Sequence, residues 1–152
     1  MTQNGKATTV RTTFTRATGI SIEIKADPDV VWALLTKASD FPRWNSIVTS
    51  IEGNIALGET IKLKSILDAK RTFKLKVKEF EPAKRLAWGD PMGNRIYTIT
   101  KNQNGGVTFT LNEKIGGQLF PLFAKMIPSF DQSFEQFASD LKKESEIIMN
   151  SK

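Results

Sequence analysis

The spacing of hydrophobic residues changes once along this chain, and that change constrains the fold class more than any other feature. Before about residue 118, apolar and polar residues alternate, as in Ile20, Ile22 and Ile24. A period of two is typical of strands with one buried face. Beyond residue 118 the apolar positions recur every three or four residues, the period of an amphipathic helix: Leu119, Phe123, Met126, Phe130, Phe134, Phe137 and Leu141. Strands followed by one helical stripe predict an α+β fold with a C-terminal helix.

Seven strands are expected before the helical stripe. The clearest alternation places Phe73, Leu75 and Val77 on one face and lysines on the other, as expected for an antiparallel sheet with one face in water. Residues 102–106 predict a hairpin turn between the last two strands. The expected strands lie around residues 20–25, 47–52, 60–67, 73–81, 86–88, 95–99 and 107–113.

Two short helices are expected between the first two strands. Asp27 is suited to cap a helix that begins at Pro28, where the missing N–H of proline costs no hydrogen bond. A second short turn is expected over residues 41–44.

The C-terminal stripe contains a proline that conflicts with one continuous helix. Pro128 would lose a hydrogen bond and clash with the preceding turn, and Ser129 with Gln132 resembles a capping box. We therefore expect a kink or break at Pro128, and fraying from residue 142 onward.

The 152 residues match one domain and contain neither cysteine nor histidine. This composition excludes disulfides, Cys-type metal sites and histidine-dependent triads. Proton chemistry would need carboxylates, lysines or Tyr97, and no cofactor is expected. Absence of cysteine leaves the redox compartment undetermined, so the cytoplasm is only the default expectation.

The net charge of +6 is concentrated partly at the N-terminus, where Lys6, Arg11 and Arg16 lie in a stretch without acids. Residues 1–19 are expected to form a flexible arm and residues 20–149 a single ligand-binding domain. No apolar run approaches the ~18 residues of a transmembrane helix.

A row of lysines is expected on the outer sheet face: Lys62, Lys64, Lys74, Lys76 and Lys78. The row suits either an anionic partner or a solvated surface that discourages edge pairing. Phe73 has the opposite parity, so the lysines lack the aromatic platforms of single-strand recognition. A solvated face is favoured, and no nucleic-acid partner is expected.

Four segments together resemble the START-like, Bet v 1-like superfamily, and within it the polyketide cyclase/dehydrase and lipid transport family, also called SRPBCC. They are ADPDVVWALLTKASDFPRWNSIV, FKLKVKEFEPAKRLAW, GGVTFTLNEKIGG and LFPLFAKMIPSFDQSFEQFASDLKK. The chain departs from the family pattern at Ser46, often a proline, and at Pro128. The resemblance implies a helix-grip fold, in which a curved seven-stranded antiparallel sheet surrounds the long C-terminal helix.

The resemblance also implies a cavity between sheet and helix. Its expected walls are Phe73, Leu75, Val77, Trp88, Tyr97, Ile99, Phe109 and Leu111 from the sheet, and Phe120, Phe123, Ile127, Phe130 and Phe134 from the helix. The competing interpretation is that these residues simply fill the core.

Three polar residues share the inward parity of these apolar ones: Arg95, Tyr97 and Glu113. If Tyr97 lies opposite Phe109, then Glu113 is one diagonal step from Arg95 and within reach. The pair either orients a ligand carbonyl or carboxylate, with Tyr97 as a further donor, or is a structural ion pair.

The expected function is binding or carriage of an apolar or amphipathic small molecule, lipid or polyketide-like. The alternative is a cyclase or dehydratase that uses Glu113, Tyr97 or Arg95 for proton transfer. A protein-interaction module is third. Ligand identity and oligomeric state stay open.

Overall fold

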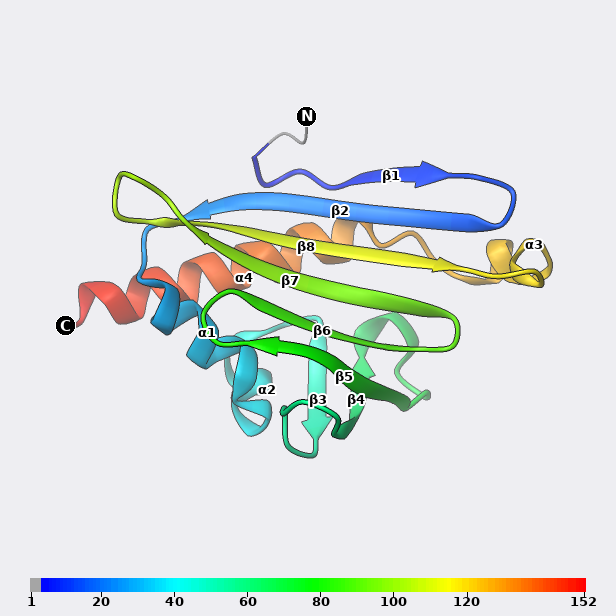
Figure 1. The fold of residues 1–152 in the computed structure, drawn as a ribbon, viewed down its shortest axis with the longest axis horizontal. Helices are drawn as coiled ribbons and strands as arrows, with labels where there is room; N and C mark the ends of the chain where they lie inside the picture. Colours follow the sequence, from blue (N-terminus) through cyan, green and yellow to red (C-terminus); the bar gives the residue numbers. More distant parts are fainter. Residues whose placement is uncertain (1–3) are drawn as a thin grey trace.

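The structure is a computed structural model that describes residues 4–152. Its strands form one antiparallel sheet in the order β1-β2-β8-β7-β6-β5-β4-β3, and the long helix α4 runs along one face of that sheet (Figure 1). The strands are β1 (Thr8–Arg11), β2 (Thr15–Ile24), β3 (Val48–Glu52), β4 (Thr60–Ser65), β5 (Phe73–Glu81), β6 (Arg85–Asp90), β7 (Gly93–Lys101) and β8 (Val107–Gly116). The helices are α1 (Pro28–Thr36), α2 (Phe41–Trp44), α3 (Phe120–Phe123) and α4 (Asp131–Asn150), with 3-10 turns at Ala38–Asp40, Ile66–Asp68 and Ala124–Met126.

The seven expected strands and the two short helices are confirmed, and with them the helix-grip architecture. Alternation along β2, β7 and β8 places one set of side chains against α1 and α4. Because the strands pair in register, inward residues form rows across the sheet, such as Leu86, Tyr97, Leu111 and Ile20. These rows are the framework on which the interior is built.

The N-terminal boundary differs from expectation, because the sheet has an eighth strand. β1 pairs antiparallel with β2, and β2 begins at Thr15 rather than near Ile20. This part of the sequence is rich in threonine and has no apolar alternation, so the hydrophobic pattern gave no sign of a strand. The threonines form hydrogen bonds instead: Thr9 Oγ1 lies 3.0 Å from Thr18 Oγ1 and donates to Asp131. β-branched polar residues suit an edge strand without an apolar alternation. Residues 4–19 therefore belong to the folded unit, and residues 1–3 lie outside the described part of the chain.

The C-terminal segment breaks at Pro128, as predicted. α3 and a 3-10 turn precede the proline, and α4 begins only at Asp131. The expected capping box does not form, because Phe130 occupies the cap position and Ser129 Oγ accepts only the N–H of Asp131 (3.3 Å).

The expected fraying after residue 142 is wrong, since α4 continues to Asn150. Ile148 and Met149 pack against the core, and Glu146 accepts the N–H of Lys25 at 2.9 Å. Tertiary contacts therefore hold a stretch whose composition is polar.

An aromatic cluster fills the interior where α1 and α2 meet α4. Phe137 is 2% exposed, and its ring lies 5.7–6.4 Å, centroid to centroid, from four other aromatic rings. These neighbours are Phe41, Trp44, Tyr97 and Phe109. We call this region the filled half of the interior.

Candidate functional site: a cavity between the sheet and the start of helix α4

The other half of the interior is hollow. A cavity of about 250 Å³ lies between the sheet and the segment that leads into α4. Its walls come from β4 to β8, from residues 126–128, and from the first two turns of α4. We call this region the hollow half.

The predicted site residues divide between the two halves. Those that line the cavity are Phe73, Leu75, Trp88, Arg95, Leu111, Glu113, Ile127, Phe130 and Phe134. Four others are buried without lining it: Val77, Tyr97, Ile99 and Phe109. A period of two shows which face of the sheet a residue lies on. It does not show at which position along the strand the helix moves away from the sheet and leaves a cavity.

The predictions for Phe120 and Phe123 as cavity residues are wrong. Phe120 is buried outside the cavity, and Phe123 is 41% exposed. Both belong to α3, which the break at Pro128 detaches from the axis of α4 and leaves at the end of the sheet (Figure 1). A helical stripe that continued through the proline would have pointed them inward.

Several lining residues were not predicted, and only some carried a signal. Ile115 continues the inward alternation of β8, Leu63 shares the inward face of β4, and Phe137 belongs to the helical stripe. Others are polar or small residues of strands and of α4, such as Ser65 and Ser133, and some come from loops, as with Arg71 and Met92, which no periodicity could have identified.

Arg95 and Glu113 form the expected ion pair on the cavity wall. The register differs by two residues from the expected one, because Tyr97 pairs with Leu111 and Arg95 lies directly opposite Glu113. Arg95 Nη2 donates to Glu113 Oε2 at 2.7 Å, and the two side chains are only 16% and 15% exposed. Burial opposes the charge on Arg95, but the adjacent Glu113, with a contribution from Tyr97, outweighs it and raises the Arg95 pKa. Arg95 therefore stays cationic in the wall.

A second arginine, not predicted as a site residue, fixes the segment that closes the cavity. Arg16 is 3% exposed and donates to the carbonyl oxygens of Ile127 (3.0 Å) and Pro128 (2.6 Å). Phe130 lies close to both arginines, with guanidinium carbons 4.7 Å (Arg16) and 5.9 Å (Arg95) from its ring centroid. Burial, followed by the nearby Arg11, lowers the Arg16 pKa. Arginine nevertheless stays charged in proteins, so two cations lie close to one aromatic ring.

The wall also contains buried donors that no described residue satisfies. Trp88 lies directly opposite Arg95 on β6 and β7, and both Trp88 Nε1 and Arg95 Nε are buried without a hydrogen-bond partner in residues 4–152. An unsatisfied buried donor costs about 1–3 kcal/mol. These N–H groups therefore favour a molecule that presents an acceptor oxygen.

The groups in or beside the wall that could transfer a proton are Tyr97 and the carboxylates of Glu113, Asp90 and the exposed Asp68. Tyr97 is buried beside the cavity, and burial raises its pKa to about 12, so its phenol stays protonated. Glu113 is engaged by Arg95, and Asp90 Oδ1 accepts the N–H groups of Met92 (2.9 Å) and Gly93 (3.2 Å). Within residues 4–152, no cluster of three acidic side chains is arranged to hold a metal ion.

The family model for polyketide cyclase/dehydrase and lipid transport matches residues 8–146. The chain belongs to this family. The match begins at Thr8, the first residue of β1, which agrees with a folded unit that starts before residue 20. A comparison with curated protein sequences gave no significant match.

Solved structures share the fold at low sequence identity. A norcoclaurine synthase point mutant from Thalictrum flavum is 11% identical with a TM-score of 0.67, over 93% of this chain and 98% of that one. A START superfamily protein from Mycobacterium smegmatis is 10% identical, TM-score 0.64, over 87% and 98%. A conserved protein of unknown function from Enterococcus faecalis is 14% identical, TM-score 0.66, over 91% and 75%. At these identities the likeness concerns the fold alone.

Among the described residues, no helix has the length and apolar content needed to cross a bilayer.

Proposed function

We propose that this protein binds one apolar or amphipathic small molecule in the cavity of the hollow half. The observation that carries the proposal is a cavity of about 250 Å³ whose apolar walls include a buried ion pair and unsatisfied donors. A dry cavity of roughly 150 Å³ already binds benzene, so the space is adequate for a larger ring system or a short acyl chain.

The polar groups indicate how such a ligand is oriented. Pockets of this kind use mainly apolar walls for affinity and a few placed polar groups for orientation. Arg95 Nε and Trp88 Nε1 lie on neighbouring strands, and a carbonyl or carboxylate oxygen would satisfy them. The ligand's apolar body would then lie against Phe73, Leu75 and Leu111.

The enzyme alternative has weaker support. A cyclase or dehydratase needs a proton donor or acceptor of suitable pKa close to the reacting carbon. Tyr97 is held protonated and does not line the cavity, Glu113 already accepts a hydrogen bond from Arg95, and Asp68 lies at the water-exposed part of the wall. We therefore favour binding or carriage over catalysis.

Blocking the cavity tests the proposal. Leu75→Trp adds bulk to a half-buried wall residue, whereas Leu57→Trp adds the same bulk to a residue that is 64% exposed on the β3–β4 connection. With the fluorescent probe anilinonaphthalene sulfonate, we expect Leu75→Trp to weaken binding by about tenfold or more, because the larger side chain occupies space in which the probe would bury its own apolar surface. Leu57→Trp should leave binding unchanged.

Native mass spectrometry of freshly purified protein gives a second readout. A copurified small molecule that is present in the wild type and in Leu57→Trp, but absent from Leu75→Trp, supports the proposal. Equal probe affinity in all three proteins, with no copurified molecule in any, would contradict it.

A further inference from the structure

The end of the molecule beside the cavity carries an apolar surface in which four side chains of residues 117–128 are exposed. Leu119 is 62% exposed, Leu122 72%, Phe123 41% and Met126 78%. Single exposed apolar residues need no explanation, but a cluster of large ones marks an interaction site. We call these four residues and Phe14 the apolar tip.

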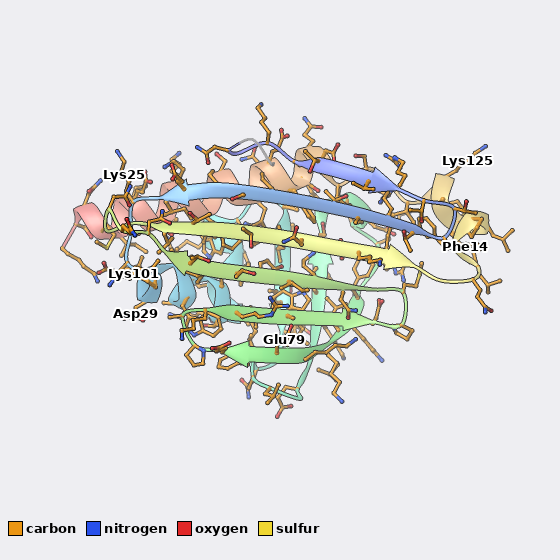
Figure 2. The ribbon with its side chains drawn as sticks, turned by 45° about the horizontal axis from the view of Figure 1, so that its top comes forward. Phe14, Lys25, Asp29, Glu79, Lys101 and Lys125 are labelled. Carbon is orange, nitrogen blue, oxygen red and sulfur yellow. The ribbon has the colours of Figure 1, made fainter. Side chains whose placement is uncertain are left out.

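Phe14 joins the cluster from the β1–β2 hairpin. It is 53% exposed, and its carbonyl oxygen accepts the N–H of Gly117 at 3.1 Å. α3 lies at the end of the sheet beside this hairpin (Figure 1), and Phe14 and Lys125 lie at the same end of the molecule (Figure 2). Two segments that are far apart in sequence thus form one tip.

The two segments that form the tip carry basic side chains and no acidic ones. Residues 8–19 contain the exposed Arg11 and the buried Arg16, and residues 117–130 contain the exposed Lys125. The neighbouring β6–β7 turn adds Asp90, whose carboxylate accepts the N–H groups of Met92 and Gly93. Asp131, directly after residue 130, accepts a hydrogen bond from Thr9. Exposed apolar side chains with cations close by are typical of segments that lie in the interface of an anionic bilayer.

Two alternatives fit the tip less well. A second copy of this chain docked through the same tip would bring the cations Lys125 and Arg11 of both copies into one interface, which places like charges near each other. A stable protein interface takes about 20–30 residues from each partner, far more than two short segments supply. Insertion into a lipid surface needs only the apolar side chains themselves.

We propose that the apolar tip docks the protein onto anionic lipid bilayers. Met126, beside Ile127 and Pro128, also lines the cavity, so docking would bring the cavity wall to the bilayer surface. The docking proposal stands whether or not the cavity binds a ligand.

Vesicle binding tests the proposal with the full chain. Sedimentation with extruded vesicles of phosphatidylcholine and phosphatidylserine should pull down the wild type, and vesicles of phosphatidylcholine alone should do so less. Leu122→Gln with Met126→Gln should weaken binding by about tenfold or more, since two apolar side chains lose most of their transfer free energy. The matched control is Leu57→Gln with Ile147→Gln, two residues 64% and 53% exposed outside the tip; it should bind like the wild type.

A charge comparison locates the electrostatic contribution. Lys125→Glu should weaken binding more than Lys74→Glu, which changes an exposed residue of the outer lysine row. The difference should shrink as salt is added, because screening weakens surface attraction.

Three results would overturn the proposal. The first is a wild type that binds neither kind of vesicle, and the second is binding that survives Leu122→Gln with Met126→Gln but disappears when Lys62, Lys74 and Lys76 are changed to Glu. The third is a wild-type dimer in sedimentation velocity that this tip variant dissociates, because the tip would then be a subunit interface. Far-UV circular dichroism and thermal melting check that each variant is folded.

Discussion

The filled and hollow halves of the interior are built from the same strands and the same helix, yet one is solid and the other encloses space. In the filled half Phe137 contacts aromatic rings from α2, β7 and β8. In the hollow half, a cavity of about 250 Å³ lies between the sheet and the start of α4. The difference arises because α1 and α2 add side chains to the filled half, whereas the other end is closed only by the broken segment before α4.

The rows of inward side chains across the sheet also change, from polar in the hollow half to apolar in the filled half. The row of Trp88, Arg95, Glu113 and Thr18 lies at the hollow end and carries an ion pair. The row that lies two steps closer to the filled half consists of Ile99, Phe109 and Ile22, and all three are apolar. A buried charge is tolerated only where its side chain has a charged or hydrogen-bonding partner and room to reach it. The ion pair and the cavity therefore occur in the same part of the interior. The polar residues of this otherwise apolar face lie where the interior is no longer fully packed.

The largest expected effect comes from truncating equivalent rings in the two halves. Phe109→Ala should lower the free energy of unfolding by about 3–5 kcal/mol, because this ring is fully buried, packs against Tyr97 and Phe137, and does not line the existing cavity. Phe130→Ala, at a half-buried ring beside an existing cavity, should cost about 1 kcal/mol, since little new empty volume is made. Urea unfolding measures both. Equal losses would mean that the two halves are equally well filled.

The next effect concerns the ion pair of the hollow half. Arg95→Met or Glu113→Gln alone should cost about 2–3 kcal/mol, somewhat less than breaking a fully buried pair because both side chains keep slight exposure. The double variant should cost less than the sum of the two single variants, which a double-mutant cycle would reveal. Strict additivity would show that the two side chains do not stabilise each other.

A smaller effect is expected at the segment that closes the hollow half. Arg16→Gln removes charged hydrogen bonds to the carbonyls of Ile127 and Pro128, and should cost about 1–2 kcal/mol. Hydrogen exchange should become faster between residues 127 and 131, while the filled half stays protected. Arg11→Gln makes the same charge change at an exposed position and is the control. Unchanged exchange in Arg16→Gln would mean that the segment is held by other contacts.

The smallest effect concerns pH and the far end of α4, beyond the filled half. Burial would raise the Glu146 pKa, but hydrogen bonds from Lys142 and the Lys25 N–H lower it below the ordinary 4.5. The folded state therefore favours the charged carboxylate, so this stabilisation is present above the ordinary pKa and is lost as the pH falls through the folded one.

Glu146→Gln should accordingly cost about 0.5 kcal/mol at neutral pH and almost nothing near pH 3, as expected for a partly exposed pair. Denaturant titrations at both pH values measure the change. Glu52→Gln, which removes an exposed carboxylate of β3, is the matched control. A pH-independent loss in Glu146→Gln would assign its effect to helix packing instead.

Much of the fold and part of the site could be predicted from the sequence. The alternation along residues 73–77 and 107–113 identified two strands and the inward face of each, and Pro128 predicted the break before α4. Both features depend on only a few neighbouring residues. The threonine-rich β1 gave no such signal, since an edge strand gains its stability from pairing and from contacts such as Thr9 with Asp131. The polar end of α4 likewise carries no local signal of its stability, because contacts with the core and with Lys25 hold it in place.

The sequence by itself determined the strand faces, the helical stripe, the proline break and the inward parity of Arg95 and Glu113. Only the tertiary structure decided the register that sets Arg95 opposite Glu113, the role of Arg16, and which phenylalanines line the cavity. Local patterns are set by backbone geometry over a few residues. A cavity is the space left between surfaces that separate segments of the chain contribute, here residues 47–115 and 126–137, so no local pattern contains it.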